Sequence, residues 1–220
     1  MIKCCVFDLD GTLLYTLATL THYVNLVLLR NNLGSITEEE CKSFIGNGAR
    51  LLIKRALLKN GIEDGELCER ILNEYNSEYN KDTLYLTEPY EGITNMLSEL
   101  RARKIKLAVL SNKPNATTQL VVSGIFGDAF DVIYGAREGI ALKPAPDSLI
   151  SLISELGAQP SEVMYVGDTD VDIKAGKAAG VRSAVGVTWG YRPTEELISA
   201  GADLTVDSPD GIVREVDLLA

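Results

Sequence analysis

Short apolar runs alternate with helical patterns along most of this chain. The runs are apolar on successive positions, which is typical of strands buried on both faces of a parallel sheet; they cover residues 3–7, 106–110, 163–166 and 183–187, with a weaker run at 131–134. Apolar residues recur at helical spacing within 93–100 and 149–156, and shorter helical patterns cover 117–122 and 172–179. This alternation predicts a parallel sheet covered by helices on both faces.

Residues 16–86 interrupt the alternation, because they contain helical patterns and no predicted strand. We expect helices at 17–30, 38–44, 48–59 and 64–79. The predicted fold is therefore α/β: residues 1–15 and 88–220 form a Rossmann-like, three-layer α/β/α catalytic core, and residues 16–87 form an inserted helical cap. Pro89 and Gly92, which commonly interrupt helices and strands, lie at the second connection between the two parts.

Composition narrows the class of partner. Of the 220 residues, 46% are hydrophobic, and the net charge is −10. An acidic surface disfavours nucleic acid and anionic membranes, so we expect neither as a partner. Anionic substrates would need local compensation from a metal ion, a lysine or helix N-termini.

The four cysteines form no CxxC pair, which indicates reduced thiols. No apolar run approaches the length of a membrane span, and we expect a cytoplasmic protein.

Polar side chains follow the predicted strands at the edge where open parallel sheets bind ligands. After successive strands come carboxylates, a hydroxyl, an amide and a lysine: Asp8 and Asp10; Ser111, Asn112 and Lys113; Lys143; and Asp168, Asp170 and Asp172. Oxygen ligands of this kind suit a hard divalent cation such as Mg²⁺. A hydroxyl and a lysine suit a phosphate group. Such a cation would also make the clustered carboxylates tolerable.

Asp8 and Asp10 have distinct predicted roles. Asp8 ends the first strand and is free to act as a nucleophile, while alternation along extended backbone places Asp10 on the same side. Asp10 can then donate a proton to the leaving group and take one from water. The single histidine, His22, lies in the insert, where we expect it to pack against its neighbours. The sequence therefore disfavours a Ser-His-Asp catalytic triad.

Each motif also has a purely structural interpretation. Asp8 and Asp10 could form a solvated turn, Ser111-Asn112 could cap the following helix, and Lys143 could lie on the surface. Acidic residues such as Asp170 and Asp172 stabilise a helix N-terminus without any ligand. For that reason we favour Asp168 over Asp172 as a metal ligand, and Asp172 over Asp170.

Taken in order, four segments resemble the motifs of the haloacid dehalogenase-like hydrolase superfamily: residues 8–13 (DLDGTL), 111–113 (SNK), Lys143-Pro144 and 167–172 (GDTDVD). The insert after the first motif is similar to the helical cap of that superfamily. Residues 44–57 of the insert and the tail segments 187–191 and 202–203 resemble phosphoglycolate phosphatases.

The resemblance implies roles for the motif residues. Asp8 would form an aspartyl-phosphate, and Asp10 would be the general acid/base and bind Mg²⁺ through its backbone carbonyl. Asp168 would be a further metal ligand, and Asp172 would support the ligands without touching the ion. The phosphoryl group would be bound by Ser111, Asn112 and Lys143, with Lys143 screening Asp8. Tyr15 departs from the Asp or Asn that is usual at this position, and we expect it to alter cap closure or substrate choice.

The cap carries weaker signals. The N–H groups of Gly46, Asn47 and Gly48 could meet a carboxylate of the substrate, with Arg50 nearby, or the segment could be only a turn between helices. We expect Trp189 and Tyr191 to pack rather than bind.

These features together predict a Mg²⁺-dependent phosphatase of a small phosphomonoester. The first candidate substrate is 2-phosphoglycolate, and inorganic pyrophosphate is the second. An acid at position 10 argues against a dehalogenase, and Leu20 argues against a sugar-phosphate mutase, which would carry histidine there. A phosphoacceptor regulatory protein and a catalytically idle scaffold are the alternatives from other classes, although the cap argues against the former and the intact acid set against the latter. The sequence leaves open whether the protein is a monomer or a homodimer.

Overall fold

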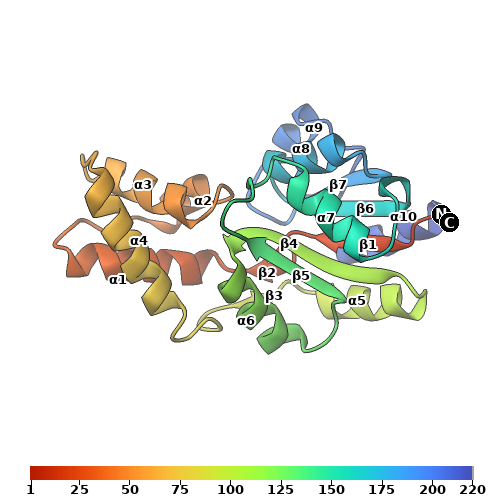
Figure 1. Cartoon of the computed structure of the whole chain (residues 1–220), viewed down its shortest axis with the longest axis horizontal. Coiled ribbons are helices and arrows are strands. Elements are labelled where there is room, and N and C mark those ends of the chain that lie inside the picture. Colours follow the sequence, from red (N-terminus) through yellow and green to blue (C-terminus); the bar gives the residue numbers. More distant parts are fainter. Residues whose placement is uncertain (220) are drawn as a thin grey trace.

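A computed structural model describes residues 1–219 of the chain. Its centre is a six-stranded sheet in the order β5-β4-β1-β6-β7-β8, in which every neighbouring pair is parallel. The strands are β1 (Cys4–Phe7), β4 (Lys106–Pro114), β5 (Val132–Ala136), β6 (Val163–Gly167), β7 (Ser183–Val187) and β8 (Leu204–Val206). Helices cover both faces, which confirms the predicted α/β core (Figure 1).

The side chains of β1 show why its run is apolar throughout. Cys5 and Phe7 pack into the hydrophobic cluster on one face of the sheet, while Cys4 and Val6 pack into the cluster on the other. Alternate residues of a strand point to opposite faces, so a central strand with helices on both sides must be apolar at every position.

Two sets of helices make up the outer layers. The first face is covered by α5 (Ile93–Ala102), α6 (Asn115–Phe126) and α10 (Pro209–Leu218). The second is covered by α7 (Asp147–Glu155) and α8 (Asp170–Ala179), with α9 (Thr194–Ser199) packed beside α8 against β7. A short 3-10 turn, Pro160–Glu162, precedes β6. None of the helices within residues 1–219 is long and apolar enough to cross a bilayer.

The helical insert is a bundle of α1 (Leu17–Arg30), α2 (Glu38–Phe44), α3 (Ala49–Lys59) and α4 (Gly65–Tyr79). These helices share a hydrophobic cluster of their own and lie to one side of the sheet (Figure 1). The side chain of Thr37 caps α2 and Asp64 caps α4, so both helix starts follow from local sequence. We use "cap" for these four helices and their connections.

Several elements differ from the sequence expectations. The connections between the cap and the core pair as a two-residue antiparallel ribbon, β2 (Leu14–Tyr15) with β3 (Glu88–Pro89), where no strand was expected. Strand β4 continues past Leu110 to Pro114, and β8, α9 and α10 were not predicted. The exact boundaries proposed for core and cap, 15/16 and 87/88, stay a prediction.

Candidate active site

The carboxyl ends of the central strands bring the predicted polar residues together. Asp8 follows β1, Ser111 and Asn112 lie within β4, and Asp168 follows β6. Because β1 lies between β4 and β6, these ends are adjacent at one edge of the sheet. Lys143 reaches the same place from the connection after β5, as the order of the motifs predicted.

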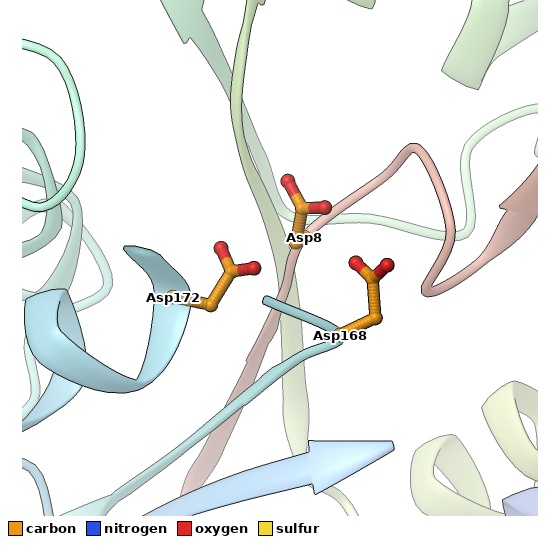
Figure 2. A group of neighbouring side chains, drawn as sticks. All are labelled: Asp8, Asp168 and Asp172. Carbon is orange, nitrogen blue, oxygen red and sulfur yellow. The ribbon is translucent and has the colours of Figure 1, made fainter. Parts of the chain in front are cut away.

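Asp8, Asp168 and Asp172 form a buried carboxylate cluster, in which one oxygen of each lies within 4.8 Å of the others. Their side chains turn toward a common space at the end of β1 and β6 (Figure 2). All three donors are carboxylate oxygens, and burying three like charges together is costly without a compensating cation. The donor set therefore fits a hard divalent metal ion.

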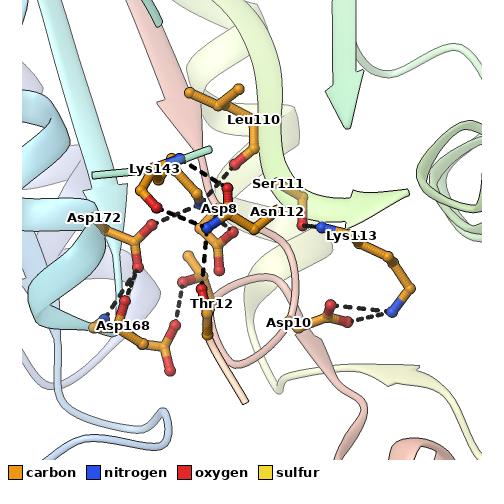
Figure 3. Close-up of polar contacts among 12 residues, drawn as sticks. Asp8, Asp10, Thr12, Leu110, Ser111, Asn112, Lys113, Lys143, Asp168 and Asp172 are labelled. Carbon is orange, nitrogen blue, oxygen red and sulfur yellow. Dashed lines mark hydrogen bonds and ion pairs between the residues drawn. The ribbon is translucent and has the colours of Figure 1, made fainter. Parts of the chain in front are cut away.

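Lys143 provides part of that compensation. Its Nζ donates to Asp8 Oδ1 at 2.6 Å, to Asp172 Oδ1 at 2.7 Å and to the carbonyl oxygen of Leu110 at 3.0 Å (Figure 3). Burial by itself lowers the pKa of Lys143, but Asp172 and Asp8 outweigh burial and hold that pKa well above its usual value. The ammonium is thus a fixed positive charge beside Asp8.

Asp8 itself is almost completely buried. Burial raises the pKa of its carboxyl to about 7, with Lys143 opposing the rise and Asp172 adding to it. Only Oδ1 of Asp8 is bound by Lys143, and Oδ2 has no hydrogen-bond partner among residues 1–219. One carboxylate oxygen therefore faces the site without a competing protein contact.

Asp172 supports Lys143 and caps its own helix. Its Oδ2 accepts hydrogen bonds from the backbone N–H of Thr169 at 3.1 Å and from Thr169 Oγ1 at 2.6 Å. Tyr165 donates its hydroxyl to Oδ1 at 3.2 Å. A Cβ on Gly167 would lie 2.2 Å from Asp172 Cβ, so glycine is needed at 167 for this approach. Asp172 is thereby oriented by neighbours in its own motif.

Asp168 is fixed from the opposite side. Thr12 Oγ1 donates to its Oδ1 at 3.1 Å, and the backbone N–H of Tyr191 donates to its Oδ2 at 2.9 Å. Burial raises the pKa of Asp168 well above its usual value. Gly11 has a φ of +94°, and a Cβ there would lie 2.3 Å from Asp168 Oδ2. The glycine of the first motif thus makes room for the carboxylate of the fourth.

Asp10 lies apart from the carboxylate cluster. Lys113 Nζ donates to both of its side-chain oxygens, at 2.8 and 3.0 Å (Figure 3). The sequence placed Lys113 at this edge but assigned it no partner. Asn112 links two other segments, because its Nδ2 donates to the carbonyls of Lys143 at 3.0 Å and Gly46 at 3.1 Å.

A pocket lies between the cap and these strand ends. Asp8, Asp10, Ser111 and Lys143 line its core side, and Gly46, Gly48, Ala49, Tyr75 and Tyr79 are among the residues on its cap side. The volume that the centres of water molecules can occupy inside this pocket is about 60 Å³. Because one water molecule needs about 10–15 Å³ of such volume, the pocket has room for a small metabolite.

Comparison with known proteins agrees with this geometry. The family model described as haloacid dehalogenase-like hydrolase matches residues 5–186. The chain belongs to the haloacid dehalogenase-like hydrolase family. The resemblance noted from the four motifs is thereby confirmed, and the enzyme is a hydrolase similar to phosphoglycolate phosphatases.

Three relatives illustrate that similarity. A phosphoglycolate phosphatase of Pectobacterium atrosepticum is 33% identical over 203 residues, which is 91% of this chain and 86% of that protein. An N-acetylmuramic acid 6-phosphate phosphatase of Pseudomonas aeruginosa is 27% identical over 98% of this chain and 95% of its own length. The crystal structure of a predicted phosphoglycolate phosphatase from Haemophilus somnus superposes with a TM-score of 0.90 at 27% identity, covering 97% of each chain.

Several sequence candidates do not line the pocket, among them Arg50, Asn47 and Asp170. Arg50 is exposed on the outer side of α3, where it pairs with Glu69. As the second residue of that helix, Arg50 lines a different groove and not the pocket, so the structure does not place it at the expected substrate contact. Asp170 forms an exposed ion pair with Lys174. This agrees with the expectation that Asp170 is less suited than Asp168 or Asp172 to bind a metal ion.

Other cap residues have structural partners. Asn47 accepts a hydrogen bond from Arg55 Nη2 at 3.0 Å, which holds the loop before α3. His22 is exposed beside Tyr85, and Trp189 donates to the carbonyl of Thr12 at 3.0 Å.

Two residues in the hydrolase's site carried no clear sequence signal. Arg192 donates to the carbonyls of Lys42 at 2.7 Å and Ile45 at 2.9 Å, and so joins the core to the end of α2. Tyr79, the last residue of α4, lines the pocket. Both depend on how the cap packs on the core, which no local pattern encodes.

Proposed function

We propose that this hydrolase is a Mg²⁺-dependent phosphatase that acts on a small phosphomonoester through an aspartyl-phosphate on Asp8. The observation that carries the proposal is the placement of Asp8. One of its oxygens is bound by Lys143 and the other has no hydrogen-bond partner among the described residues, at the edge of a pocket that also contains Asp10 and Ser111.

In the first step, Asp8 Oδ2 attacks the phosphorus atom and the bond from phosphorus to the ester oxygen breaks. Asp10, entering this step protonated, gives its proton to the departing alkoxide. Lys143 offsets negative charge beside Asp8, and Ser111 and Asn112 border the transferred phosphoryl group.

In the second step, Asp10 accepts a proton from a water molecule as that water attacks phosphorus. The bond to Asp8 breaks, inorganic phosphate leaves, and both carboxyl groups return to their starting states. The cap covers the pocket and limits competing water.

A bound Mg²⁺ ion would supply positive charge that offsets the phosphoryl oxygens. Asp8 and Asp168 are the side chains suited to hold it, together with the backbone carbonyl of Asp10, as the family resemblance implies. Asp172 is engaged by Lys143 and Thr169, so it would support these ligands rather than bind the ion.

The first candidate substrate is 2-phosphoglycolate. The size of the pocket and the similarity to phosphoglycolate phosphatases both favour it. The relative that acts on N-acetylmuramic acid 6-phosphate makes a larger acidic sugar phosphate the natural comparison.

The test is continuous phosphate release from a panel of compounds: 2-phosphoglycolate, N-acetylmuramic acid 6-phosphate, simple sugar phosphates and pyrophosphate. Each is assayed with Mg²⁺, with chelator, and with the Asp8→Asn variant. We expect Mg²⁺-dependent turnover, highest on 2-phosphoglycolate and absent in Asp8→Asn, while Asp170→Asn keeps its activity as a matched control. Preference for pyrophosphate would overturn the substrate assignment. Uptake of a single phosphate per chain without turnover would favour the phosphoacceptor alternative.

A further inference from the structure

A residue on the cap side of the pocket carries a buried polar atom without a hydrogen-bond partner in the described part of the chain. Tyr79 is only 2% exposed and lines the pocket, yet its hydroxyl has no hydrogen-bond partner among residues 1–219. A buried hydroxyl without a partner is costly, and native structures seldom keep one without a reason. A ligand in the pocket is the simplest source of the missing hydrogen bond.

Lys113 lies beside the Tyr79 ring, with its Nζ 4.8 Å from the ring centre. An ammonium group has three N–H donors. Asp10 is the only hydrogen-bond partner of Lys113 Nζ within the described chain, through its two oxygens. The side chain is 4% exposed and lines the pocket, so an N–H remains for a ligand rather than for bulk water.

The N-terminus of α3 borders the same space. Gly48 and Ala49 line the pocket, and no side chain caps the helix at Gly48. The first N–H groups of a helix favour anions. Gly48 has a φ of +87°, a backbone conformation that L side chains rarely adopt. Glycine thus permits the turn that leads into this helix.

We infer that Lys113, Tyr79 and the N-terminus of α3 form a subsite for a carboxylate carried by the substrate next to its phosphoryl group. This inference rests on the proposed function and extends it to a substrate class, short phosphoesters that bear a carboxylate. Lys113 supplies a single positive charge to the subsite, so the subsite suits a monoanion better than a second, dianionic phosphate. The small pocket requires the two anionic groups to be close together.

The test compares 2-phosphoglycolate with ethyl phosphate, which has the same short ester and lacks the carboxylate. The readout is the ratio of the two kcat/KM values in wild type, Tyr79→Phe and Lys113→Met. We expect a wild-type ratio of about 100 or more, about tenfold lower in Tyr79→Phe and lower still in Lys113→Met, since each removes a donor to the carboxylate. Because Lys113 also holds Asp10, the ratio isolates the carboxylate from effects on proton transfer.

Tyr23→Phe is the matched control. Tyr23 stacks on Tyr79, but its hydroxyl donates to the carbonyl of Asp82 at 2.8 Å and it does not line the pocket. We expect this variant to keep the wild-type ratio. A wild-type ratio near one, or ratios in Tyr79→Phe and Lys113→Met equal to wild type, would overturn the subsite.

Calorimetric binding of the two esters to Asp8→Asn protein separates this inference from the proposed function. We expect 2-phosphoglycolate to bind more tightly than ethyl phosphate, and this difference to shrink when Tyr79→Phe is added. If wild-type protein hydrolyses no compound of the panel, the proposed function fails while this binding difference still tests the subsite. Equal binding of both esters would overturn it.

Discussion

Tyr191 joins a carboxylate of the site to the hinge of the cap. Its backbone N–H donates to Asp168 at 2.9 Å, and its hydroxyl accepts the backbone N–H of Thr16 at 3.0 Å. Thr16 is the residue before α1, where the chain passes from core to cap. One buried residue, through its backbone and its side chain, therefore links the position of Asp168 to the start of the cap.

Tyr191→Phe should destabilise the protein. It removes the hydrogen-bond acceptor of a buried backbone N–H, at a cost of about 1–3 kcal/mol in the free energy of unfolding. Urea unfolding measures this loss, and the exposed Tyr85→Phe is the control. Since the backbone N–H of Tyr191 still reaches Asp168, we expect kcat to fall less than in Asp172→Asn. Unchanged stability would show that the hydroxyl contact contributes nothing.

Asp172→Asn should lower activity about 10- to 100-fold, as is usual when a group that orients catalytic residues is lost. The substitution removes the charge that draws Lys143 toward Asp172, while the contacts of Lys143 to Asp8 and Leu110 persist. Asp170→Asn lies two residues away on the exposed face of α8, and we expect it to retain the wild-type rate. Equal losses in the two variants would contradict a specific role for Asp172.

The metal-free protein should lose stability as pH rises through the range set by Asp8. Its pKa is raised to about 7 in the folded protein, against about 3.9 in an unfolded chain. Between these values the folded state binds more protons than the unfolded state, so this contribution to stability falls as pH increases and is absent above pH ~7. Thermal melts in chelator between pH 5 and pH 8 measure the slope.

Asp8→Asn is the control for that slope, because it removes the titrating group. We expect its melting temperature to depend less on pH and to exceed that of wild type at pH 8 without metal. Added Mg²⁺ should stabilise wild type more at pH 8 than at pH 5, since protons compete with the ion for carboxylates. Parallel pH profiles for the two proteins would argue against a raised pKa at Asp8.

Arg192→Met should loosen the closed cap. It removes two hydrogen bonds from a charged donor to the end of α2, each worth about 1.5 kcal/mol or more, so the equilibrium between closed and open cap should shift by about 100-fold or more. A higher KM and faster proteolysis of the loop between α2 and α3 would report this change. Arg182→Met, at an exposed position of the core, is the matched control. An unchanged KM together with unchanged proteolysis would rule out this contact as a restraint on the cap.

Sequence alone determined the parts of the site that depend on local pattern. Asp8, Ser111 and Asp168 could be placed at one edge because each follows or ends an apolar run, and parallel strands bring their carboxyl ends together. The helices of the cap were predicted nearly to the residue because the helical pattern is local, and the caps of two of them, Thr37 and Asp64, also lie within one turn. Short or half-buried elements such as β8 carried too little pattern to be predicted.

Tertiary structure decided the contacts between residues far apart in the chain. Lys113 pairs with Asp10, Tyr191 reaches Thr16, and the buried hydroxyl of Tyr79 has no hydrogen-bond partner within residues 1–219. Arg50 turned away from the pocket for the same kind of reason, because its direction depends on how α3 packs. Hydrophobic periodicity reports which face of an element is buried, whereas these contacts depend on how separate elements of the core and the cap pack against one another.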